Sequence, residues 1–135
     1  MISEPPKRGE LYFADLEDIG QKLVLVVSPD DVNELLNPVV CLVTSTERER
    51  SLETYVQIDP PEGGVWKPST ILCHAILTLE RWRLAPEALG SVSATTQESV
   101  DECLCSALGI DRHAPTQEGA GADPAPDEPT APAAE

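Results

Sequence analysis

The sequence predicts a small domain that is mainly β and barrel-like, with a short helix after the second strand and a longer helix at its C-terminal end. Valine-rich runs at Leu23 to Val27 and Val39 to Val43 are typical of buried strands, because β-branched side chains pack well on a pleated surface. A short segment of helical composition, Asp30 to Leu36, joins these two runs. An amphipathic helical stretch follows Thr95. Together these observations indicate a sheet with helices attached.

Five strands are expected, each bounded by residues that favour turns. Arg8-Gly9-Glu10 opens the first strand, and Gly20 supplies a turn before the second. Residues 80–84 are expected to form a turn and residues 86–93 a connection. The expected strands are Leu11 to Leu16, Lys22 to Ser28, Val39 to Thr46, Glu53 to Ile58 and Thr70 to Leu79.

Local signals predict where the two helices begin and end. Ser28 is the expected N-cap of the short helix. Thr95 and Glu98 have the spacing of a capping box that would open the C-terminal helix, and Gly109 is placed to end it. This helix is expected to pack on the sheet through residues at helical spacing: Val100, Cys103, Leu104, Ala107 and Leu108.

Composition limits the domain organisation and the class of protein. The 135 residues allow one domain, at 8–110, between an N-terminal lead at 1–7 and an acidic Pro/Ala-rich tail at 111–135 that we expect to be disordered. The net charge of -15 repels nucleic acid at long range and argues against a general nucleic-acid binder. No run approaches the roughly eighteen apolar residues of a membrane span, and the first nine residues show no apolar signal segment, so we predict a cytoplasmic protein.

The four cysteines are expected to be free, buried thiols. They lie in apolar surroundings without C-x-x-C spacing. A zinc set of Cys73, His74, Cys103 and Cys105 is disfavoured, because the last two are two apart on a helix and point to different faces. We therefore expect no metal and no cofactor.

Hydroxyl residues follow the two valine-rich strands. Ser28 comes after the first, and Thr44, Ser45 and Thr46 come after the second. Hydroxyls at adjacent strand ends can share one rim of a sheet, where side chains meet a ligand. This rim is the first candidate for a functional site.

Five segments in this order resemble the MazF/PemK toxins of type II toxin-antitoxin systems, and the resemblance spans about residues 8–110. It implies an SH3-like β-barrel of the CcdB/MazF/PemK type, usually a homodimer, that cleaves single-stranded RNA without a metal. It also implies an antitoxin that lays an acidic peptide across the RNA groove. The segments are Arg8 to Tyr12, Leu23 to Asp30, Val43 to Ser45, Ser69 to Leu84 and Leu108 to Ile110.

The resemblance also implies site residues. In the family, an Arg before the second strand and a Thr after the third perform most of the chemistry, and a Gln and an Arg on the long strand line the same groove. Thr44 keeps the Thr and Lys22 replaces the first Arg, so these two are the expected catalytic residues. Ala75 and Leu77 replace the Gln and the second Arg. The residues expected to assist RNA binding are Arg8, Ser45, Arg48 and Arg50.

The substitutions leave a second function open. Strand alternation places Ala75 and Leu77 on one apolar face with Ile71 and Cys73, and turns His74 away from this groove. The alternative is therefore a catalytically inactive protein that engages a protein partner through the apolar groove, as CcdB gyrase poisons share the architecture without ribonuclease activity. His74 is more readily interpreted as a structural residue. Two interpretations of Trp66 and Trp82 are open: stacking on RNA bases, or packing against other apolar residues.

Overall fold

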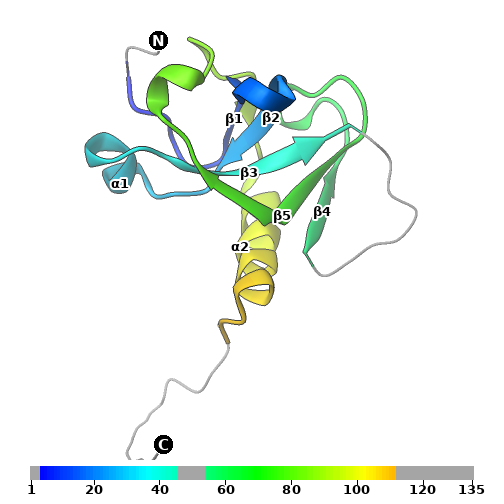
Figure 1. The fold of residues 1–135 in the computed structure, drawn as a ribbon. Helices are drawn as coiled ribbons and strands as arrows, with labels where there is room; N and C mark the ends of the chain where they lie inside the picture. The colour runs from blue at the N-terminus through cyan, green and yellow to red at the C-terminus, as the bar shows by residue number, and fades with distance from the viewer. Residues whose placement is uncertain (1–3, 46–53, 112–135) are drawn as a thin grey trace, which may run out of the picture.

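The computed structural model describes residues 4–45 and 54–111. Within these ranges six strands form one antiparallel sheet in the order β4-β5-β3-β2-β1-β6, which curls into a half-barrel (Figure 1). The predicted mainly β architecture, with a short helix after the second strand and a C-terminal helix, is confirmed. The strands are β1 (Glu10–Asp15), β2 (Gln21–Val26), β3 (Val39–Thr44), β4 (Tyr55–Ile58), β5 (Ser69–Thr78) and β6 (Gly90–Ser91).

Two α-helices and three short 3-10 helices complete the described part of the fold. They are α1 (Asp30–Leu35), α2 (Ala94–Leu108), η1 (Glu17–Ile19), η2 (Glu62–Gly64) and η3 (Arg81–Arg83). The short strand β6 lies inside the expected connection 86–93, where it pairs with β1. No helix in the described ranges is long and apolar enough to cross a membrane. Residues 46–53, which include Arg48 and Arg50, and the predicted tail after Asp111 lie outside the described residues.

Each face of the sheet carries its own hydrophobic cluster. The cluster that we call the helix-side core lies under α2, which packs against β4 and β5 (Figure 1). It consists of Leu11, Leu25, Cys41, Val43, Val56, Ile58, Val65, Ile71, Cys73 and Val100. The opposite face carries the outer core, which consists of Tyr12, Ala14, Val24, Val26, Val40, Leu79 and Leu84. The segment 79–84 thus covers the outer face only along β1, β2 and the start of β3.

Close backbone contacts bring the two edges of the sheet together. The η2 turn after β4 packs against β6. A Cβ atom at Gly90 would lie 2.6 Å from the carbonyl carbon of Gly63, and one at Gly64 would lie 2.4 Å from the carbonyl oxygen of Leu89. Gly64 also has a φ of +84°, which glycine adopts without strain. These contacts fix the start of the segment that runs from η2 into β5.

The cysteines are free thiols in the structure, as predicted, although only Cys41 and Cys73 are fully buried. Cys103 and Cys105 are half-buried on α2. A hydrogen bond with Cys41, together with burial, raises the pKa of the Cys73 thiol well above its usual range. Such a thiol stays protonated and behaves as a small hydrophobic side chain.

The helix caps differ from the predicted ones. The N-cap of α2 is Ser93, whose hydroxyl accepts from the backbone N–H of Thr96 at 3.1 Å. The predicted capping box at Thr95 is therefore wrong by two residues. The carboxylate that such a box would supply comes instead from Glu62 of η2, which accepts from the backbone N–H of Ser93 at 2.9 Å. Gly109 ends α2 in the left-handed conformation, as predicted.

We expect Glu62 to stabilise the fold in a pH-dependent manner. Hydrogen bonds from the Thr96 hydroxyl and from the Ser93 backbone lower the pKa of Glu62. Because the folded-state pKa lies below that of the unfolded chain, the stabilisation is complete above about pH 4.3 and is lost as the pH falls through the lowered value. Glu62→Gln should reduce the free energy of unfolding by about 1 kcal/mol at pH 7. Urea denaturation at pH 7 and pH 3 measures the effect.

The matched control is Glu87→Gln, which changes an exposed carboxylate on the surface. It should leave the free energy of unfolding unchanged at both pH values. A loss for Glu62→Gln that is equally large at pH 3 would contradict the assigned role of the carboxylate.

Candidate functional site

A pocket of about 430 Å³ opens at the rim of the sheet where β2 begins and β3 ends. This volume is within the range of ordinary ligand sites. The segment between η2 and β5 forms its other wall. The lining residues are Phe13, Gln21, Lys22, Leu23, Leu42, Val43, Thr44, Ser45, Val65, Trp66, Lys67, Ser69 and Leu72. Three of the predicted site residues, Lys22, Thr44 and Ser45, are among them.

Strand register places Lys22 beside Thr44. Leu23 of β2 pairs with Val43 of β3, and the antiparallel register continued by one residue sets Lys22 opposite Thr44. Residues directly opposite on neighbouring strands have Cβ atoms about 5 Å apart and share a face. Lys22 is exposed and Thr44 is half-buried. An ammonium group and a hydroxyl thus face the same small volume from rigid strand ends.

The charge of the pocket is opposite to the charge of the chain. The sequence has 24 acidic and 9 basic residues, yet the described lining contains Lys22 and Lys67 and no carboxylate. Hydroxyls of Thr44, Ser45 and Ser69 add polar groups. The Ser69 hydroxyl donates to the Lys67 carbonyl oxygen at 3.0 Å, which orders the backbone next to the second lysine. A pocket with two ammonium groups and several hydroxyls favours an anion such as a phosphate.

Ser28 does not belong to this rim. Because β2 and β3 are antiparallel, the residue after β2 and the residues after β3 lie at opposite ends of the strands. The expectation of a shared hydroxyl rim is therefore wrong for Ser28. Its side chain is buried, donates a hydrogen bond to Asn33 Oδ1 and accepts one from the Val39 N–H at 2.9 Å. It is also not the N-cap of α1, a position that Pro29 occupies.

A β-bulge changes the predicted faces of the long strand β5. Leu42 of β3 pairs with Leu72, whereas the preceding Cys41 pairs with Ile76, so the register shifts by three residues. An odd shift reverses which side chains share a face. Ile76 therefore packs with Ile71 and Cys73 against the helix-side core, and Leu77 packs against the outer core.

The predicted apolar groove is therefore wrong. Ile71 and Cys73 are fully buried, so they offer nothing to a partner. Ala75 and Leu77 are half-buried and do not line the pocket. The surface on which the alternative function of partner binding depended is not formed by these residues.

His74 is also placed differently. It alternates with Thr70 and Leu72 on the face that carries Thr44, whereas the sequence placed it away from the groove. Its Nδ1 atom lies 3.4 Å from the Thr54 hydroxyl oxygen, and its ring centroid lies 5.8 Å from that of Tyr55. His74 is exposed and is not part of the pocket lining. The structural role of His74 stays a prediction.

Among the predicted arginines, Arg8 is the one that the structure describes, and it does not line the pocket. The Arg8 guanidinium forms an ion pair with Asp101 of α2, and its backbone N–H donates to Asp30 Oδ1 at 2.8 Å. Arg48 and Arg50 lie outside the described residues. The cation that sequence reasoning missed is Lys67. The signal that could have found it is the run Trp66-Lys67-Pro68-Ser69, which follows a Gly-Gly turn directly before the longest strand.

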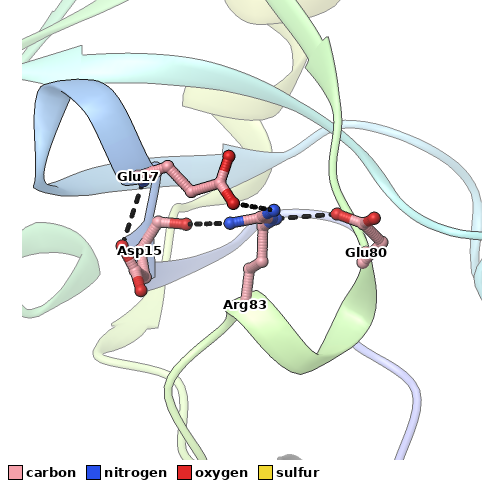
Figure 2. A network of polar contacts seen from close by, with 4 residues as sticks. All are labelled: Asp15, Glu17, Glu80 and Arg83. Atoms are coloured by element: carbon pink, nitrogen blue, oxygen red, sulfur yellow. Dashed lines mark hydrogen bonds and ion pairs between the residues drawn. The ribbon is translucent and has the colours of Figure 1, made fainter.

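Arg83 fixes the turn that leads into Lys22. Its guanidinium contacts Glu80 at 2.7 Å, Glu17 at 3.0 Å and the Asp15 carbonyl oxygen at 3.2 Å (Figure 2). The hydrogen bond from Arg83 lowers the pKa of the Glu80 carboxyl. Glu17 has a φ of +53°, an unusual conformation that its contact with Arg83 helps to hold. The turn between β1 and β2 is thus tied to η3, and the start of β2 is fixed relative to the pocket.

No group of three or more His, Cys, Asp or Glu side chains in residues 4–45 and 54–111 is arranged to hold a metal ion. The described lining of the pocket carries two cationic side chains, Lys22 and Lys67.

The curled sheet, with a short helix after the second strand and a long helix on one face, defines a MazF-like toxin fold with a positively charged pocket at its rim. The sequence profile of the PemK-like, MazF-like toxins of type II toxin-antitoxin systems matches residues 7–108. The chain belongs to this family, which confirms the predicted resemblance.

Individual relatives match this chain over nearly their whole length. The chain is 30% identical over 112 residues to Endoribonuclease EndoA of Bacillus subtilis (strain 168), a match covering 77% of this chain and 95% of that protein. It is 29% identical, with a TM-score of 0.69, to an endoribonuclease in complex with its cognate antitoxin from a mycobacterial species, covering 78% and 97% of the two chains. It is 25% identical, with a TM-score of 0.66, to the Mycobacterium tuberculosis toxin MazF-mt6, covering 76% and 98%.

Proposed function

We propose that this toxin is an endoribonuclease that cleaves single-stranded RNA at the pocket around Lys22 and Thr44, without a metal. The observation that carries the proposal is the charge of this pocket, whose described lining combines two lysines with three hydroxyl residues and no carboxylate in a chain of net charge -15. Relatives that share its fold over nearly their full length are named endoribonucleases. Long-range repulsion of RNA by the acidic chain would be overcome locally at this pocket.

The proposed reaction needs only the RNA and proton transfers. The 2′-hydroxyl oxygen bonds to the adjacent phosphorus while the bond from phosphorus to the 5′-oxygen breaks. The products are a 2′,3′-cyclic phosphate and a free 5′-hydroxyl, and the proton lost by the 2′-oxygen balances the proton gained by the 5′-oxygen. Negative charge accumulates on the non-bridging phosphate oxygens in the transition state. Groups placed to neutralise this charge provide most of the catalysis.

Lys22 and Thr44 fit these roles by position. The Lys22 ammonium supplies positive charge, and the Thr44 hydroxyl beside it can donate a hydrogen bond to a non-bridging oxygen. Among the described residues that line the pocket there are neither carboxylates nor imidazoles, the groups through which proteins most often hold divalent cations. A lysine in this position supplies the charge that a metal provides in other nucleases. DNA lacks the attacking 2′-hydroxyl and would not be cleaved.

An antitoxin is the second proposed partner. A solved relative is in complex with its cognate antitoxin. In this chain an acidic peptide would find the same two lysines that attract RNA, Lys22 and Lys67, and would compete with RNA for them. The homodimer that the family resemblance implies stays a prediction.

Cleavage of a long single-stranded RNA by the purified protein, with and without EDTA, tests the proposal. We expect cleavage to persist in EDTA and to fall at least about a hundredfold in Thr44→Ala, because a donor to the transition-state oxygens is lost. Thr95→Ala, which changes an exposed threonine on α2, is the control and should retain full activity. The absence of cleavage by the wild-type protein, or full activity in Thr44→Ala, would reject this assignment.

A further inference from the structure

Trp66 exposes a large aromatic surface at the wall of the pocket. Its side chain is 64% exposed, although tryptophan is usually largely buried. One side of the indole lies near Phe13, with ring centroids 6.0 Å apart and an interplanar angle of 35°. Both aromatic residues line the pocket together with Lys22 and Lys67. The indole is thus supported by another ring and open to a ligand at the same time.

The backbone on both sides of Trp66 is held in place. Val65, which precedes it, is 4% exposed and belongs to the helix-side core. The turn before Val65 is fixed by the contact of Gly64 with Leu89. After Trp66, the Lys67 carbonyl accepts the hydrogen bond from Ser69. The exposed position of the indole is therefore a consequence of an ordered segment, which makes it a preorganised surface.

We propose that Trp66, supported by Phe13, is a stacking platform for a nucleobase of the RNA next to the scissile phosphate. This inference rests on the proposed ribonuclease function and adds a residue that positions the substrate. An indole stacks on any base through its π-face, while neighbouring cations hold the backbone phosphates. Lys22 and Lys67 supply these cations in the same pocket. In the described lining, the combination of an open ring with two lysines and no carboxylate matches a nucleotide better than it matches an apolar peptide segment.

Stacking on a base that takes no part in the bond changes predicts a specific kinetic signature. A base held on Trp66 contributes similar binding energy in the ground state and in the transition state. Loss of the indole should therefore raise KM and leave kcat nearly unchanged. A residue with a merely structural role would lower the melting temperature or the amount of active enzyme and would not change KM selectively.

The kinetic test compares the two tryptophans of the chain. Trp66→Ala should raise KM about tenfold or more on a short RNA that contains a mapped cleavage site, and Trp66→Phe should restore most of the affinity. Trp82→Ala is the matched control, because Trp82 is also exposed, at 54%, but lies under the Arg83 guanidinium and outside the pocket lining. An abasic site at the stacked position should weaken the wild type and have no further effect in Trp66→Ala. An unchanged KM in Trp66→Ala would overturn the proposal.

A binding measurement separates this inference from the proposed function. Since the sequence has two tryptophans, Trp82→Phe leaves Trp66 as the sole indole reporter. A 2′-O-methylated RNA, which cannot be cleaved, should quench its fluorescence, and an abasic oligomer of the same charge should not. Quenching in a protein that cleaves no RNA would reject the ribonuclease and retain the platform. Cleavage of RNA without quenching would reject the stacking platform and retain the ribonuclease. Quenching by an acidic peptide, together with no quenching by RNA, would also reject the platform.

Discussion

The Lys22→Ala variant is expected to cleave RNA at least about a hundredfold more slowly than the wild type, with the loss in kcat. Lys22 is exposed at the start of β2 and faces Thr44, so its removal should leave the core intact while it removes positive charge next to the scissile phosphate. Preorganised groups that act on transition-state charge typically contribute two to three orders of magnitude to the rate. Single-turnover cleavage at saturating enzyme measures the effect on the chemical step directly.

Lys67→Ala is the matched control, because it removes the other lysine of the same pocket. It should raise KM with little change in kcat. It should also reduce the magnitude of the slope of log RNA affinity against log salt concentration by about 0.7, the value for one contact to a single-stranded phosphate. Equal losses of kcat in both lysine variants would show that Lys22 has no special role. Lys22→Arg should keep activity, since the guanidinium offers a planar fork of donors suited to phosphate.

The sequence contained the central pair of the candidate site but not its surroundings. The family resemblance named Lys22 and Thr44 as a pair, and the antiparallel register of β2 and β3 places them opposite each other in the structure. The aromatic wall comes from a segment whose position depends on contacts remote in sequence. Gly64 meets Leu89 through backbone atoms, and no local pattern near Trp66 encodes that contact.

The faces of β5 could not be derived from alternation alone. A strict period of two is valid only while the register is continuous, and the shift between Cys41 and Leu42 reverses the faces beyond it. Nothing in the residues 71–77, which form an unbroken apolar run apart from His74, marks the position of this bulge. The prediction of one apolar groove failed for this reason.

Asn33 explains a further difference, and its replacement should have the largest effect on stability. The sequence treated Ser28 as a helix cap because a serine before a proline and two acids is a common start signal. In the structure Asn33 is fully buried, and its side-chain amide donates to the carbonyl oxygens of Pro6 and Ser28, at 3.0 Å each. Its Oδ1 atom accepts from the Ser28 hydroxyl. One amide therefore joins the N-terminal segment, the end of β2 and α1.

Asn33→Ala should lower the free energy of unfolding by about 3 kcal/mol. The substitution leaves buried carbonyl oxygens at Pro6 and Ser28 without this partner, and each unsatisfied buried group typically costs about 1–3 kcal/mol. Urea denaturation followed by far-ultraviolet circular dichroism measures the loss. Asn37→Ala, which makes the same change at an exposed position four residues later, should change the free energy of unfolding by less than about 0.5 kcal/mol.

The same pair of variants distinguishes stability from catalysis. Asn33 contacts Ser28, which follows β2. Lys22 and Thr44 lie at the other end of the β2–β3 pair. The loss of Asn33 should therefore reduce the fraction of folded protein without changing kcat per folded molecule. Cleavage normalised to folded protein at low temperature should therefore equal that of the wild type. If instead the normalised rate fell with stability, the two ends of the sheet would be coupled, and the pocket would depend on the buried amide as well as on its own rigid strands.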